Sequence, residues 1–167
     1  RAAGREASYT DAVRRAGELL RATLAAKGKI VGVASPVASN AVVAAFRDLP
    51  DRRLLVVGDG TEAPRVRDEA GANVEFVGEV SRERLRELLR GARAFVFAAD
   101  EDFGILPVEA QACGTPVIAY GRGGALETVT GDGVRRTGAF FTEQTSAAIA
   151  RAVRDFDHVL PTIDVDA

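Results

Sequence analysis

Short apolar runs alternate with segments of helical spacing along most of the chain. The apolar runs end at glycine or polar residues, which is typical of buried strands. They predict strands at 29–34, 53–60 with a closing glycine turn, 74–78, 94–99, 116–120 and 138–142. The segments between them predict helices at 40–48, near 62–70, after Ser81, after Gly104, at 123–129 and at 145–156.

The two ends of the chain differ from this alternation. Val13, Ala16, Leu19, Leu20 and Leu24 recur at helical spacing before Gly28. We therefore divide the chain into an N-terminal helical segment (1–28), an α/β domain (29–157) and a linker-like tail (158–167).

Strands that alternate with helices indicate right-handed crossovers and a parallel sheet covered on both faces. The predicted fold class is α/β, a Rossmann-like doubly wound parallel sheet. Ligands of this architecture bind outside the carboxyl ends of the strands. That rule directs attention to the segments after residues 34, 58, 78, 99 and 120.

Composition narrows the classes of function. The 167 residues carry 22 basic and 24 acidic side chains, a net charge of −2, so we expect no nucleic-acid partner. Cys113 is the one cysteine, which favours a packed side chain in a reducing, cytoplasmic setting. We expect no metal site and no transmembrane segment, because neither a Cys/His cluster nor a long apolar run is present.

The stretch "DEDFGILPVEAQACGTPVIA" (100–119) holds the strongest candidate site. Pro107 suits a first helical turn, so the helix begins near Gly104 with free backbone amides at about 103–106. Such amides form an anion site. Glu109 lies one turn further and Glu101 lies on the rim, so two carboxylates that accept hydrogen bonds from hydroxyl groups bracket the anion site. A nucleoside diphosphate sugar has that layout.

Each of these features also has a simpler interpretation. Glu101 and Glu109 could also be solvated acids, which are favourable near a helix start. "GDG" (58–60) is also a common strand-to-helix turn. "GRGG" (121–124) is either a plain loop or a contact in which Arg122 is the one basic candidate.

"EDFGILPVE" followed by "AQACGTPVIA" resembles the E-x7-E signature of retaining GT-B glycosyltransferases of family 4. The similarity extends over "AFRDLPDRRLLVVGDG", "VEFVGEVSRERLRELLRGARAFVFAADEDFG" and "GRGGALETV", from about Val42 to Gln144. The resemblance implies that 29–157 is the C-terminal, nucleotide-sugar-binding half of such an enzyme.

The resemblance also implies roles for residues. Glu101 would contact the transferred sugar as the catalytic residue, Glu109 would bind the donor ribose, and backbone near Val80 would hold the base. Amides that would bind the sugar and diphosphate are those of Phe103, Gly104 and Ile105. Further donor-binding candidates at strand ends are Gly58, Gly60 and Arg122.

Three departures from the family pattern stand out. An Arg and a Lys that normally follow the first strand, and that neutralise the donor diphosphate, fall on Gly32 and Val37 when the sequences are aligned on Phe46. The acceptor-binding N-terminal half has no counterpart, so we expect that domain as a missing partner. The end of the chain, "VLPTIDVDA", resembles the linker that precedes the first strand in this family, which a rearranged chain would explain.

The sequence therefore predicts a nucleoside diphosphate sugar-binding domain of a retaining hexosyltransferase, inactive or weak in isolation. Its donor is a substrate, and no cofactor is expected. The alternatives are a non-catalytic binding module with a degenerate donor site, or a flavodoxin- or receiver-like signalling domain. The expected location is cytoplasmic, or membrane-peripheral in the full enzyme.

Overall fold

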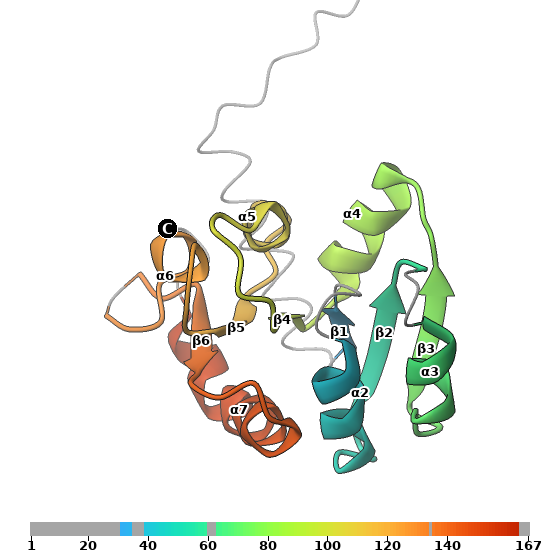
Figure 1. The fold of residues 1–167 in the computed structure, drawn as a ribbon. Coiled ribbons are helices and arrows are strands. Elements are labelled where there is room, and N and C mark those ends of the chain that lie inside the picture. The colour runs from blue at the N-terminus through green and yellow to red at the C-terminus, as the bar shows by residue number, and fades with distance from the viewer. Residues whose placement is uncertain (1–30, 35–38, 60–62, 134, 164–167) are drawn as a thin grey trace, which may run out of the picture.

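The computed structural model describes residues 31–34, 39–59, 63–133 and 135–163. Six strands in this part of the chain form one sheet in the order β3-β2-β1-β4-β5-β6, and every neighbouring pair is parallel (Figure 1). The strands are β1 (Val31–Ala34), β2 (Arg53–Val57), β3 (Val74–Gly78), β4 (Ala94–Phe97), β5 (Val117–Tyr120) and β6 (Gly138–Phe141). This order confirms the predicted doubly wound fold, whose direction of winding reverses between β1 and β4.

The helices that connect the strands cover both faces of the sheet (Figure 1). They are α2 (Ser39–Arg47), α3 (Ala63–Asp68), α4 (Arg82–Gly91), α5 (Ile105–Ala112), α6 (Ala125–Thr128) and α7 (Ser146–Val159), followed by the 3₁₀ helix η2 (Leu160–Thr162). Each helix predicted after residue 38 is therefore confirmed. The helix predicted within 1–28 lies outside the described residues.

α7 continues to Val159, beyond the predicted helix end at residue 156. Val159, Leu160 and Ile163 pack on the hydrophobic core, and Ile163 forms a parallel bridge with Arg136. The division of the chain into a domain (29–157) and a tail (158–167) stays a prediction. Residues 164–167 lie outside the described part of the chain.

Alternation along the strands divides the core between the two faces. In β4, Ala94 and Val96 pack in the cluster that includes α2 and α7, whereas Phe95 and Phe97 pack in the cluster that includes α4, α5 and α6. Because both faces are covered, all four residues of β4 are buried and the strand is apolar throughout.

A capping interaction fixes the start of α4 close to the end of β3. The Ser81 hydroxyl accepts a hydrogen bond from the Arg84 N–H at 3.2 Å. A backbone hydrogen bond and one from Ser81 lower the pKa of Glu83, so this carboxylate is part of the cap. The predicted Ser81 start of the helix is confirmed.

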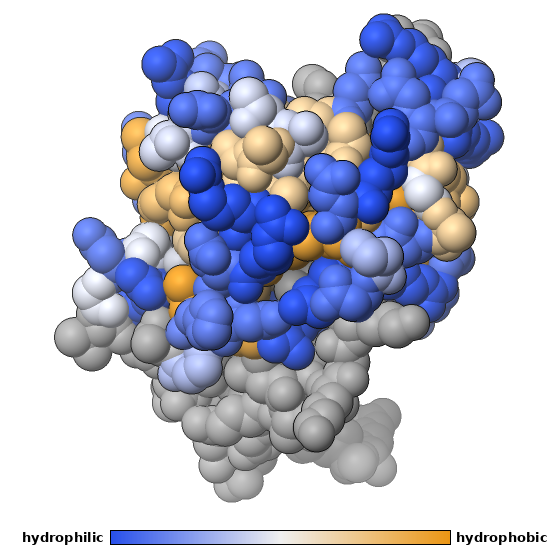
Figure 2. All heavy atoms as spheres, turned by 90° about the horizontal axis from the view of Figure 1, so that it is seen from below, coloured by the Kyte–Doolittle hydropathy of each residue, from blue (hydrophilic) through white to orange (hydrophobic). Residues whose placement is uncertain are grey.

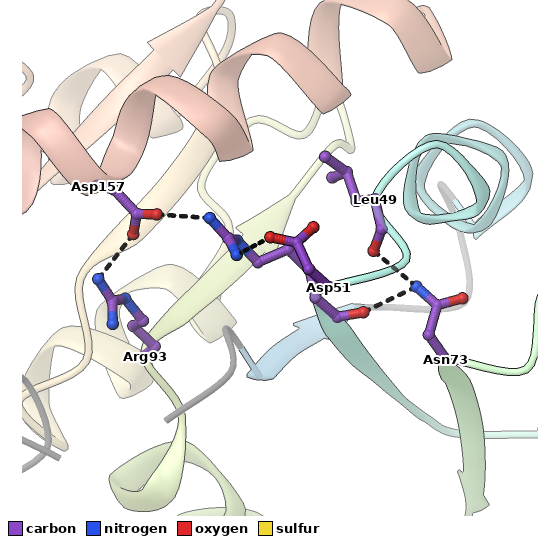
Figure 3. Close-up of polar contacts among 6 residues, drawn as sticks. Leu49, Asp51, Asn73, Arg93 and Asp157 are labelled. Carbon is purple, nitrogen blue, oxygen red and sulfur yellow. Dashed lines mark hydrogen bonds and ion pairs between the residues drawn. The ribbon is translucent and has the colours of Figure 1, made fainter. Parts of the chain in front are cut away.

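The edge at which the strands begin is held together by polar contacts (Figure 3). The Asn73 side-chain amide donates to the backbone carbonyls of Phe46, Leu49 and Arg52 at 2.7–3.0 Å. Asp157 of α7 accepts from both Arg52 and Arg93 at 2.7 Å, which joins the helix to the segments before β2 and β4. Figure 2 shows this edge, where hydrophilic side chains predominate across the middle of the view.

We predict that Asn73→Ala lowers the free energy of unfolding by about 1–3 kcal/mol, because half-buried carbonyls lose their donor. Urea unfolding measures the change. Glu75→Ala, two residues further along β3, is the control. Its ion pair with Arg53 is about half exposed on both sides, so a loss below about 1 kcal/mol is expected. Equal losses in the two variants would contradict the role given to Asn73.

Candidate functional site

The turn between β4 and α5 is built around one glycine. Gly104 is the N-cap of α5 and has φ +70°. A Cβ atom at this position would lie 3.2 Å from the Phe97 ring, so both the backbone conformation and the packing require glycine. Gly104 also provides no side-chain cap. Within the described residues the first N–H groups of α5 thus have no side-chain cap, which suits the anion site predicted from the sequence.

Glu109 lies in the second turn of α5 and is half-buried. Because α5 follows β4 in a parallel sheet, this position is near the carboxyl edge, which confirms the predicted placement. Cys113 lies one turn further along α5, on the same side of the helix as Glu109, and its surroundings show what this side faces. Burial raises the pKa of the Cys113 thiol, the charges of Arg90 and Arg86 oppose this shift, and the charge of Glu109 adds to it. Glu109 and the α4 arginines thus lie around the same side of α5.

The loop after β5 rests directly on the loop after β4. The Gly124 N–H donates to the Glu101 carbonyl at 2.8 Å. A Cβ atom on Gly123 would lie 2.3 Å from the same carbonyl oxygen. A Cβ atom on Gly124 would lie 2.5 Å from the backbone carbonyl oxygen of Asp102. The structure therefore brings "DEDFG" and "GRGG" together through their backbones.

Two glutamines that the sequence analysis missed hold this arrangement in place. Gln111 of α5 donates to the carbonyls of Pro107 and Thr128, each at 3.0 Å, and so ties α5 to α6. Gln144 reaches from the segment after β6 to the Ala98 carbonyl at 2.7 Å. Their spacing gives no signal in the sequence, because each partner is a distant backbone carbonyl.

The other predicted donor-binding residues lie at the ends of β2 and β3, across β1 from the β4 loop. Gly58 has φ +109°, and its N–H donates to the Gly78 carbonyl at 2.8 Å. Val80 follows β3 and is half-buried. Strands in a sheet lie about 4.8 Å apart, so these ends are about 10–15 Å from that of β4. Gly60 lies outside the described residues.

The remaining predicted contacts are open to solvent. Glu101 and Arg122 are exposed, and the Phe103 and Ile105 side chains are 57% and 66% exposed. Asp100 and Asp102 are also exposed, so the rim of the β4 loop carries three neighbouring acids.

Gly32, one of the two positions matched to the missing basic pair, lies within β1 and pairs with Leu54 of β2 and Ala94 of β4. This agrees with the strand predicted at 29–34. Val37 lies outside the described residues. The sequence has no basic residue at 32–40.

The described ranges contain neither a metal-binding cluster nor a membrane-spanning helix. No group of three or more His, Cys, Asp or Glu side chains there is arranged to hold a metal ion. None of the helices described is long and apolar enough to cross a membrane.

A Rossmann-like domain with glycine-rich loops and a helix start at the carboxyl edge defines a class of nucleotide-binding folds. Residues 38–158 match the sequence pattern of the family described as "Glycosyl transferases group 1". The chain belongs to this family. The predicted recognition of a GT-B glycosyltransferase C-terminal domain is thereby confirmed.

Curated relatives share about two-fifths of the aligned residues. A GDP-mannose-dependent monoacylated alpha-(1-6)-phosphatidylinositol monomannoside mannosyltransferase of Corynebacterium glutamicum is 39% identical over 92 residues, 48% of this chain and 24% of that protein. A D-inositol 3-phosphate glycosyltransferase of Mycobacterium sp. (strain KMS) is 40% identical over 121 residues, 65% of this chain and 27% of that protein. The chain thus spans about a quarter of the length of these relatives.

Solved structures show the same fold. Anabaena Alr3699/HepE in complex with UDP-glucose superposes with a TM-score of 0.68 at 21% identity, over 93% of this chain and 45% of that one. A glycosyltransferase from Rickettsia africae superposes with a TM-score of 0.64 at 19% identity, over 95% of this chain and 46% of that one.

We predict that Gly124→Ala lowers the free energy of unfolding by about 1–3 kcal/mol through overpacking. Gly124 has φ −63° and ψ −15°, which alanine adopts easily, so the expected loss is steric. Gly91→Ala is the matched control, because a Cβ atom there meets nothing within 4 Å. Thermal and urea unfolding of both variants measure the difference, and equal stability would contradict the close approach of the two loops.

Proposed function

We propose that this domain binds a nucleoside diphosphate sugar at the carboxyl edge of its sheet, as the donor half of a hexosyl transfer reaction. The observation that carries the proposal is the docked pair of loops beside the α5 start. It brings the start of α5, the rim residue Glu101 and the half-buried Glu109 to one edge, which supports an anion site bracketed by two carboxylates.

The separation of the predicted contacts suits an elongated ligand. The start of α5 would bind the diphosphate, Glu109 the ribose hydroxyl groups, and the backbone near Val80 the base. Glu101 would face the transferred sugar. These groups extend from β4 to β3 over about 10–15 Å. Support also comes from the relatives, whose names include glycosyltransferases and a GDP-mannose-dependent enzyme.

Transfer of the sugar would depend on basic residues directly after β1 that the sequence does not contain. Backbone amides stabilise a bound anion, but a departing diphosphate also needs cations that act on its developing charge. No basic residue is present between Gly32 and Asn40. This observation favours a second candidate function, a binding module that retains the donor site without turnover.

We expect Glu109→Ala to weaken the binding of UDP or GDP by about 1–3 kcal/mol, because hydroxyl groups lose a charged acceptor. Isothermal titration calorimetry with UDP, GDP and their hexose conjugates gives the dissociation constants. Glu127→Ala on α6 removes an exposed carboxylate and serves as the control. An unchanged affinity after the loss of Glu109 would exclude the ribose role.

The second prediction of this section is that the chain alone transfers little or no hexose. Removal of one preorganised charge-stabilising donor lowers rates by about 10²–10³-fold, and no basic residue is present at 32–40. The chain also spans only about a quarter of the length of its curated relatives. Release of UDP or GDP from their hexose conjugates should stay near background.

Addition of the N-terminal half of a relative distinguishes the two candidate functions. Turnover that appears only in its presence supports a donor half, and continued inactivity with intact nucleotide binding supports the binding module. Rapid transfer by this chain alone would contradict both the prediction and the importance given to the missing cations.

A further inference from the structure

One helix beside the candidate site carries a row of exposed positive charges. Arg82, Arg86 and Arg90 are spaced by four residues along α4 and all three are exposed. This spacing places them on one side of the helix, about 6 Å apart and about 12 Å from end to end. We call them the arginine stripe. Within the described residues none of the three has an ion-pair partner, whereas neighbouring Arg84 does.

The acids of α4 offset the arginine stripe only in part. Glu83 takes part in the cap, where a backbone hydrogen bond and one from Ser81 lower its pKa, and the charges of Arg86 and Arg82 also lower it. Glu87 accepts from Arg84 at 2.9 Å. With four arginines and two glutamates, α4 keeps an excess of positive charge.

The arginine stripe faces α5 and extends to the carboxyl edge. α4 and α5 pack together through Leu85, Leu89 and Ala110, which share one apolar cluster. Arg86 and Arg90 are close enough to Cys113 of α5 for their charges to act on its thiol, as the charge of Glu109 does. Arg82 is two residues beyond Val80, at the end of α4 nearest the carboxyl edge.

Without a nearby source of positive charge, the rim of the site would repel an anion. Asp100, Glu101 and Asp102 are exposed there, and Arg122 is the one exposed cation on the docked loop. Arg67, nearer to β3, is already engaged with Asp59 at 3.6 Å and with the Phe76 ring. A diphosphate that approaches this edge meets three carboxylates, and the stripe is the positive region of α4 that can offset them.

We propose that the arginine stripe supplies the positive potential that draws and retains an anionic nucleoside diphosphate at the carboxyl edge. This inference rests on the proposed function and adds to it a source of charge on α4, in place of the cations absent after β1. The stripe acts at a distance, so it contributes to binding without a contact to the transferred sugar.

The test removes the charge of the arginine stripe by substitution, and separately removes the charge of the ligand by replacing nucleoside diphosphates with nucleosides. The variant Arg82→Gln/Arg86→Gln/Arg90→Gln is compared with Arg84→Gln/Arg151→Gln/Arg154→Gln, which removes three exposed arginines outside the stripe, two of them on α7. Dissociation constants are measured by calorimetry or amide NMR titration for UDP and GDP, and for uncharged uridine and guanosine. Thermal unfolding should show that both variants remain folded at the temperature of the titrations.

At low ionic strength the stripe variant should bind the diphosphates about 3- to 10-fold more weakly and the nucleosides unchanged. In the control variant the loss of diphosphate affinity should be less than half as large. At about 0.5 M salt the difference should vanish, because charges more than about 4 Å apart are then screened.

Three results would overturn the inference: an unchanged affinity for the diphosphates, an equal loss for the nucleosides, or an equal loss in the control variant. These results still leave nucleotide binding by the unmodified protein intact, and so leave the proposed function standing. If the unmodified protein binds neither nucleoside nor diphosphate, the proposed function and this inference both fail.

Discussion

The hydrogen bond from the Gly124 N–H to the Glu101 carbonyl joins two loops that leave neighbouring strands. It forms because nothing but hydrogen projects from Gly123 and Gly124, so the two backbones approach more closely than any other residue allows. The rim acids and the start of α5 belong to one of these loops, and the exposed Arg122 belongs to the other. Gln144 and Gln111 then fix the outer ends of the same two loops. A candidate site made largely of backbone groups thus depends on how close two chain segments can come.

The strands and helices could be predicted because burial on both sides of a parallel sheet leaves a strong pattern. β4 and β5 are apolar at every position, and their neighbouring helices show clear start signals such as Ser81 and Gly104. Glu109 could also be placed, since its distance from the helix start follows from local geometry. Predictions that depended on local spacing therefore succeeded.

Contacts between residues that are distant in the sequence could not be predicted. α7 extends beyond the expected end, and its Asp157 binds two arginines from before β2 and β4, which no local pattern reveals. The sequence also does not distinguish Gly104, required by its positive φ, from Gly124, required by steric contact. The roles of Glu101 and Arg122 in ligand binding remain predictions.

The contacts of Asp157 and Asn73 lie at the opposite end of the strands from the loops that follow β4 and β5. Strands of four or five residues at about 3.3 Å per residue separate the two edges by more than 10 Å, a distance at which substitutions usually act additively. The domain can therefore gain or lose stability at one edge without altering the geometry of the other. Substitutions that accumulate at the amino edge would leave the loops at the carboxyl edge in place, so the two edges can evolve, or be engineered, independently.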